Sequence, residues 1–288
     1  MRPSSRNLPR VLSIAGSDSG GGAGIQADLK AFARCGVHGM TAITAITAQN
    51  TVAVSGVWAI EPDAIVAQVR AVADDIGVDA VKIGMLGTAA TIAAVNEALD
   101  LVPDAPVVLD PVMVAESGAS LLDPEARTAL RELLLSRATV VTPNLDEAAV
   151  LVGDVGVAPA EIHDLARAVL SLGSRAVVLT GGHREEATDV FVDGERLVEI
   201  PGERYPGGTA HGSGCTHSSA LAAHLALGFE PLDAARRAKA VASEAVRQGL
   251  REVGEGAGPV DVFGLAADAP PEEAVGKGAP AGAAGRLT

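Results

Sequence analysis

The segment from Ala210 to Ala226, AHGSGCTHSSALAAHLA, places two glycines and a cysteine at the start of a helical pattern of small residues. Free N–H groups and the positive dipole end of a helix near Ser213 attract anions. Gly212 and Gly214 would let these amides converge on one phosphate or oxyanion. A helix N-terminus also lowers a thiol pKa, so Cys215 is a candidate proton acceptor or nucleophile at neutral pH. The alternative for Cys215 is a small buried side chain that only packs.

A second glycine-rich stretch, AGSDSGGGAGIQADLKAF, follows an apolar run at 11–15 and opens a helical pattern. The glycines between Gly20 and Gly24 would let the backbone approach a ligand closely. The stretch is not a Walker A loop, because no Gly-Lys-Ser/Thr follows at the required spacing, and Ile25 breaks a G-x-G-x-x-G pattern. The alternative is a tight turn between strand and helix.

Polar side chains also follow three other apolar runs. Gln49 in TAQNT carries an amide donor and a carbonyl acceptor, which suit the edge of an aminopyrimidine or a similar heterocycle, although it could be a surface loop residue. Asp110 follows VVL, and Asn144 and Glu147 follow VVTP. Such oxygens could hold hydrated Mg²⁺, which takes few protein ligands. Asn144 and Glu147 could equally form a capping box, which does not exclude metal binding.

The elements that must position these residues alternate along the chain. Apolar runs predict strands at 11–15, 40–47, 80–83, 107–109, 139–142 and 176–180. Periodic patterns predict helices at 25–33, 62–75, 89–101, 124–135, 159–172, 213–227 and 231–248. This alternation predicts a three-layer α/β/α fold with a mostly parallel central sheet covered on both faces. The segment TDVFVDGERLVEI predicts a hairpin around Asp193-Gly194 that adds antiparallel strands at one edge.

Composition narrows the function classes. The formal net charge of −14 argues against a nucleic-acid partner. No apolar run reaches the roughly 18 residues of a membrane span. Cys35 and Cys215 are far apart and form no C-x-x-C motif, which favours a reduced, cytoplasmic protein. Residues 1–10 and 267–288 are expected to be a disordered arm and tail, which leaves 11–266 as a single domain.

In their order along the chain, these stretches resemble the ribokinase-like superfamily. Within it, they closely resemble the bifunctional hydroxymethylpyrimidine/phosphomethylpyrimidine kinases of thiamine biosynthesis, from about residue 11 to residue 263. The motifs that carry the resemblance are AGSDSGGGAGIQADLKAF, TAITAQNT, KIGML, DPVM, TPNLDEA, GGH and HGSGCT.

The resemblance implies ATP-dependent phosphorylation of 4-amino-5-hydroxymethyl-2-methylpyrimidine and then of its monophosphate. It places Gly16, Asp28, Gln49 and Met85 around the pyrimidine. It assigns the anion hole and the reacting oxygen to Gly212, Ser213, Gly214 and Cys215. It places Asn144, Thr180 and Gly182 at ATP, with Asp110 and Glu147 at Mg²⁺. We also expect a homo-oligomer, most simply a dimer. A base helps only the first step, because a phosphate monoester is already ionised, so a basic Cys215 would matter more there.

Two positions depart from the family pattern. Glu116 and Thr180 stand where the family usually has Lys, and Arg184 is a candidate substitute for the second cation. Three other functions remain open at this point. A pyridoxal or pyridoxine kinase shares the fold and the anion hole. A cysteine hydrolase would need a histidine oriented against Cys215. A non-catalytic sensor of a vitamin precursor is favoured only by Glu116 and Thr180.

Overall fold

The computed structural model describes residues 8–115, 118, 121–153, 162–181, 187–206 and 208–265, and the statements that follow concern these residues. They form a nine-stranded sheet in the order β3-β2-β1-β4-β5-β6-β7-β8-β9. The strands are β1 (Arg10–Asp18), β2 (His38–Gln49), β3 (Val54–Ala59), β4 (Ala80–Ile83), β5 (Val107–Leu109), β6 (Val140–Val141), β7 (Ala176–Leu179), β8 (Asp189–Asp193) and β9 (Leu197–Ile200). The six strands from β2 to β7 along this order pair in parallel, as predicted.

Antiparallel strands lie at both edges of the sheet rather than at one. The predicted hairpin is confirmed, because β8 pairs with both β7 and β9 in antiparallel register. The strand β3, which the sequence analysis did not predict, pairs with β2 at the other edge, with Ile46 opposite Trp58. Most of its side chains are exposed, so β3 lacks the buried apolar alternation that identifies a strand in sequence.

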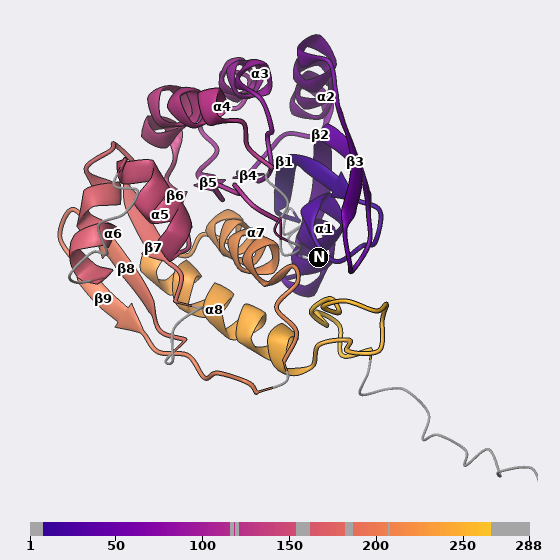
Figure 1. Ribbon diagram of the computed structural model, residues 1–288. Helices are drawn as coiled ribbons and strands as arrows, with labels where there is room; N and C mark the ends of the chain where they lie inside the picture. The colour runs from indigo at the N-terminus through magenta and orange to yellow at the C-terminus, as the bar shows by residue number, and fades with distance from the viewer. Residues whose placement is uncertain are drawn as a thin grey trace, which may run out of the picture.

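Helices cover both faces of the sheet (Figure 1). They are α1 (Gly24–Arg34), α2 (Pro62–Asp75), α3 (Ala89–Leu99), α4 (Pro124–Ala129), α5 (Leu145–Val152), α6 (Ile162–Leu170), α7 (Ser213–Ala226) and α8 (Pro231–Arg247). A π-helical turn over Leu130–Leu134 and a 3₁₀ turn over Leu135–Arg137 extend α4 across the predicted range. The predicted fold class is therefore confirmed.

Alternation along the strands creates two cores. Leu12 and Ile14 of β1 join the core under α2 to α6, whereas the intervening strand face, which includes Val11, packs against α1, α7 and α8. Because successive side chains of a strand point to opposite faces, the buried runs of β1, β4 and β5 supply both cores at once. This double burial explains why these runs are continuously apolar.

The ends of the expected domain can be compared only in part. Residues 1–7 of the expected arm, and the whole expected tail at 267–288, lie outside the described residues. Arg10 belongs to β1, so that strand begins one residue before the expected boundary. None of the described helices combines the length and the apolar character that a bilayer crossing requires.

Candidate active site

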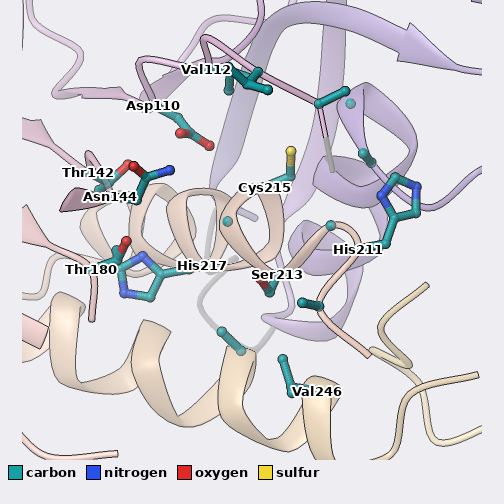
Figure 2. Close-up of a pocket in the computed structure, with 18 of the residues that line it drawn as sticks. Asp110, Val112, Thr142, Asn144, Thr180, His211, Ser213, Cys215, His217 and Val246 are labelled. Atoms are coloured by element: carbon teal, nitrogen blue, oxygen red, sulfur yellow. The ribbon is translucent and has the colours of Figure 1, made fainter. Parts of the chain in front are cut away.

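A cavity of about 530 Å³ lies at the carboxyl ends of the parallel strands, against the N-terminus of α7 (Figure 2). Successive strands contribute lining residues in their last residues or just beyond them: Gly16 and Asp18 in β1, Gln49 in β2, Met85 after β4, Asp110 after β5, Asn144 after β6 and Thr180 after β7. Ligands of open α/β sheets bind at this edge. The structure thus brings together most of the residues that the sequence analysis singled out.

The N-terminus of α7, where the sequence predicts a cradle for an anion, lies at the cavity. Gly212 caps the helix with φ +83°, and a Cβ there would lie 1.8 Å from the carbonyl oxygen of Gly22, so only glycine fits. At Gly214, by contrast, a Cβ would meet no protein atom within 4 Å. Gly212 is therefore required by the packing of the protein itself, whereas Gly214 leaves open space above the first helical amides. Ser213 and Cys215 line the cavity beside it.

Asp18 joins the glycine-rich loop to this cradle. Its buried carboxylate accepts hydrogen bonds from the backbone N–H groups of Gly20, Gly22 and Ala23 at 2.8–3.0 Å. The Nε2 atom of His211 lies 3.2 Å from the same carboxylate. Burial raises the pKa of Asp18, but these hydrogen bonds lower it below its usual value overall. The glycines thus serve a tight turn around Asp18, while Ala23 and Gly24 also line the cavity.

The pKa of the Cys215 thiol differs from the expected one. Burial in the cavity, with the charges of Asp28 and Asp110, raises its pKa to about 12, despite the opposing effects of Lys82 and the Gly24 amide. The expectation of a lowered pKa was wrong because the desolvation cost outweighs the stabilisation from the helix N-terminus. At neutral pH Cys215 is therefore a thiol in the free protein.

Asp28 lies beneath the cavity rather than on its wall. Its side chain is fully buried and does not line the cavity. One oxygen is 2.8 Å from Lys82 Nζ and accepts from Ser219 Oγ at 2.7 Å, and the other accepts from Ser13 Oγ at 2.6 Å. The expectation that Asp28 contacts the pyrimidine is therefore corrected: Asp28 holds Lys82.

Lys82 is a cavity residue that the sequence analysis missed. Its side chain is fully buried in β4 yet lines the cavity. Burial lowers its pKa, but the charges of Asp28 and Asp110 and the hydrogen bond to Asp28 raise it overall, so Lys82 remains a fixed cation. The signal that could have revealed it is a lysine inside the apolar run AVKIG, because a lysine is rarely fully buried unless it is paired.

Asp110, Asn144 and Glu147 form the acidic side of the cavity. Asn144 and Glu147 make the capping box of α5 through two hydrogen bonds of 2.9 Å, as the alternative interpretation predicted. Asp110 accepts from Ser218 Oγ at 2.8 Å. Burial and the charge of Asp110 raise the pKa of Glu147 to about 8. Burial likewise raises the pKa of Asp110.

These carboxylates fit a hydrated divalent cation. Each of the two carboxylates makes ionisation of the other less favourable, and a positive ion between them would stabilise both in their charged form. The described residues contain no group of three or more His, Cys, Asp or Glu side chains arranged to hold a metal. That donor set excludes an all-protein cage but not Mg²⁺, which keeps several waters and takes one or two carboxylates beside substrate phosphates.

Gly16, Gln49 and Met85, which the resemblance places around the pyrimidine, form another part of the cavity lining. Gly16 lies against Met85, because a Cβ at residue 16 would be 2.8 Å from Met85 Cε. The Oε1 atom of Gln49 accepts from Thr47 Oγ1 at 3.3 Å, and the Gln49 backbone N–H donates to Ser19 Oγ at 2.9 Å. Gln49 is thus held at the end of β2 beside the glycine-rich loop. Gly16, Gln49 and Met85 all line the cavity, as the sequence analysis expected.

Of the remaining residues singled out in the sequence, the structure describes Thr180 but not Gly182, Glu116 or Arg184. Thr180 lines the cavity and its backbone N–H donates to the carbonyl oxygen of Pro143 at 2.9 Å. Gly182, Glu116 and Arg184 lie outside the described residues. No histidine among the described residues hydrogen-bonds to Cys215: His211 Nε2 lies 3.2 Å from Asp18 Oδ2, and His217 Nε2 lies 3.6 Å from Asp189 Oδ2. The described residues therefore do not include the histidine–thiol hydrogen bond that a cysteine hydrolase needs.

Comparison with solved structures places this geometry in a known class. An ADP complex of Bacillus subtilis pyridoxal kinase is 39% identical in sequence and superimposes with a TM-score of 0.82, over 90% of this chain and 99% of that chain. The parallel sheet, the antiparallel edges and the cradle at the start of α7 define a ribokinase-like kinase.

Comparisons of the sequence identify one family within this class. The family model described as phosphomethylpyrimidine kinase matches residues 18–261. A hydroxymethylpyrimidine/phosphomethylpyrimidine kinase of Rhizobium meliloti is 50% identical over 257 residues, which cover 88% of this chain and 96% of the relative. The enzyme of the same name from Streptomyces coelicolor is 46% identical over 254 residues, covering 88% and 94%. The chain therefore belongs to the phosphomethylpyrimidine kinase family.

Proposed function

We propose that this protein transfers a phosphoryl group from ATP to the hydroxymethyl group of 4-amino-5-hydroxymethyl-2-methylpyrimidine, and then to the resulting monophosphate, in thiamine biosynthesis. The observation that carries the proposal is that the start of α7, at Gly212–Cys215, lines one cavity together with Gly16, Gln49 and Met85. We assign the phosphate to the first group and the pyrimidine ring to the second. Family membership supports the choice of substrate.

In the proposed reaction the alcohol oxygen bonds to the γ-phosphorus of ATP while the bond from that phosphorus to the ADP oxygen breaks. The hydroxyl proton leaves on an oxygen of the transferred phosphoryl group and is released to solvent with the product. Phosphoryl transfer depends mainly on alignment and charge neutralisation. The amides at Gly214 and Cys215 would stabilise the transferring group, and each such donor is worth on the order of 3 kcal/mol. Lys82 adds a fixed positive charge at the floor of the cavity.

Asp110 and Glu147 would hold Mg²⁺ on the acidic side, and Asn144, Thr180 and Gly182 would contact ATP. When bound, the ion would neutralise negative charge on the phosphate oxygens. Cys215 lies at the reacting end of the cradle but is protonated at neutral pH. Its role there is to pack and to orient the hydroxyl, with the thiol as a weak hydrogen-bonding group.

Recognition of the pyrimidine is assigned to the Gln49 carboxamide. Replacing it by leucine, Gln49→Leu, leaves the ring edge without a polar partner. We expect a loss of several kcal/mol in discrimination between the hydroxymethylpyrimidine and an analogue that lacks the exocyclic amine. Turnover of both compounds, measured as kcat/KM for wild type and variant, checks this. An unchanged ratio would remove Gln49 from the binding site.

A pyridoxal kinase is the second candidate, favoured by the similarity to the Bacillus subtilis pyridoxal kinase. One coupled assay tests both functions. ATP is supplied with either the hydroxymethylpyrimidine or pyridoxal, and the mono- and diphosphate products are separated. Our proposal requires the pyrimidine diphosphate to form. Faster turnover of pyridoxal without a diphosphate product would favour the second candidate, and a lack of ATP consumption with both alcohols would favour a sensor.

Two further expectations belong to this proposal. Cys35 and Cys215 are free thiols, which suits the reducing cytoplasm. A homodimer is the expected assembly. Ile46 and Trp58, a cross-strand pair on the β2–β3 ribbon, are 48% and 59% exposed and offer an apolar surface for it. Analytical ultracentrifugation of the full chain tests the dimer directly.

A further inference from the structure

His217 is a buried histidine whose ring nitrogens have no hydrogen-bond partner among the described residues. It lies on α7 four residues after Ser213, so both residues share one face of the helix. Its side chain is 5% exposed and lines the cavity. Within the described part of the chain, neither ring nitrogen makes a hydrogen bond. Because an unpaired buried polar group costs stability, such a group calls for a ligand or an ordered water as its partner.

Asp189 stands behind this ring with one oxygen already engaged. Its Oδ1 atom accepts from Lys239 Nζ at 2.7 Å and from the Gly181 N–H at 2.9 Å. Its Oδ2 atom is buried and, among the described residues, unpartnered; it lies 3.6 Å from His217 Nε2, beyond hydrogen-bond distance. The two unpartnered groups therefore face each other at the same end of the cavity.

The charge state of the imidazole limits what can bind. Burial, helped by the positive charge of Lys239 and opposed by Asp189, lowers the pKa of His217, so the ring is neutral at pH 7. A neutral imidazole supplies one N–H donor and one acceptor nitrogen. With Asp189 Oδ2, the pair presents two acceptors and one donor. A ligand that satisfies them must bring a hydrogen-bond donor, which phosphate and carboxylate oxygens at neutral pH lack.

The position along α7 shows which part of a ligand reaches this pair. Four residues of helix at about 1.5 Å each place His217 about 6 Å beyond the start of the phosphate cradle. Figure 2 draws His217 at the end of the site where Thr180 lies, away from His211. A nucleotide whose phosphates occupy the cradle would bring its nucleoside part toward this end.

We propose that His217, backed by Asp189, is a specificity-determining residue for the nucleotide, and that it binds a hydrogen-bond donor of the nucleoside: a sugar hydroxyl or the amine of the base. This inference rests on the proposed function, because it requires a nucleotide phosphate at Gly212–Cys215. Lys239 holds the Asp189 carboxylate in place.

Calorimetric binding of ADP to the full chain tests the proposal. The variants are His217→Phe, which keeps a ring of similar shape without nitrogens, and His217→Leu as a second apolar replacement. The ligands are ADP, 2′-deoxy-ADP, 3′-deoxy-ADP and inosine diphosphate, which lacks the base amine. The matched control is His224→Leu. His224 is a second buried histidine of α7, but its Nδ1 pairs with the Ala220 carbonyl and it does not line the cavity.

We expect the His217 variants to weaken ADP binding about tenfold, as loss of one buried hydrogen bond predicts. In wild type, removal of the recognised donor from the ligand should cost a similar factor, whereas the variants should bind that analogue and ADP alike. The analogue that loses its effect identifies the source, sugar or base. His224→Leu should keep the wild-type ratios.

Equal ratios of all analogues to ADP in wild type and in both His217 variants would overturn this inference and leave the kinase proposal intact. A wild-type protein that binds no adenine nucleotide would overturn both. Because every comparison is a ratio within one variant, a general loss of stability in His217→Phe does not imitate the expected result.

Discussion

The buried ion pair beneath the cavity allows a quantitative prediction. Lys82 and Asp28 are both fully buried, with 2.8 Å between Nζ and Oδ1. Lys82→Met keeps most of the side-chain volume but leaves the buried Asp28 carboxylate without its cation. Removal of one partner of a buried pair costs about 3–5 kcal/mol, because the remaining charge is uncompensated. The hydroxyls of Ser13 and Ser219 still donate to Asp28 but carry no charge.

A double variant distinguishes the effect of an uncompensated charge from the effect of altered side-chain packing. In Lys82→Met with Asp28→Asn, neither position carries a charge, and the introduced carboxamide can still accept a hydrogen bond from a serine hydroxyl. We expect this variant to recover most of the stability lost by Lys82→Met, since a neutral replacement of a buried pair is often nearly neutral in stability. The single and double variants therefore form a cycle with a large interaction energy.

Urea unfolding followed by circular dichroism measures the free energy of unfolding of each variant. For a protein of this size, a loss of about 3–5 kcal/mol corresponds to a fall in Tm of roughly 6–20 °C. Arg137→Met is the matched control: Arg137 pairs with an Asp100 side chain that is 69% exposed. Such a surface pair contributes less than about 1 kcal/mol. The reasoning would be refuted if Lys82→Met lost as little unfolding free energy as Arg137→Met. It would also be refuted if the loss in the double variant equalled the sum of the losses in the two single variants.

Three shorter predictions follow from other contacts. Cys215→Ala should slow the two phosphorylation steps by similar factors, because the thiol is protonated at neutral pH. The rate of each step is measured separately. A far larger loss of rate in the first step would show that Cys215 accepts the proton of the hydroxyl. Gly214→Ala should fold with an unchanged Tm but lose phosphoryl transfer at least about tenfold, since a Cβ there meets only open cavity space; full activity would place the phosphate elsewhere. The hydrogen bond from Arg10 lowers the pKa of Asp79 in the folded protein. Wild type should therefore be more stable than Asp79→Asn, and this advantage should be complete above the pKa of Asp79 in the unfolded chain, about 4. The advantage should vanish as the pH falls through the lower pKa of Asp79 in the folded protein. Urea titrations at several pH values would contradict this if the advantage grew in acid.

Local signals in the sequence determined the architecture and the edge of the sheet where the site lies. The apolar runs at 11–15, 80–83 and 107–109 are buried on both faces, and that double burial is visible in composition alone. The capping box at Asn144 and Glu147 is local too, because its two partners lie within one turn of the chain. The ordered motifs further indicated the family, which the comparisons confirm.

Only the tertiary structure decided the electrostatics and the long-range pairs. Asp28 and Lys82 are 54 residues apart, and Asp18 and His211 are 193 apart, so no local pattern could pair them. The Cys215 pKa depends on burial and on carboxylates from other elements, which reverse the effect expected from the helix N-terminus alone. The surroundings of the His217 ring are equally invisible in sequence. A charge in a folded protein responds to everything packed around it, and that surrounding exists only once distant segments have met.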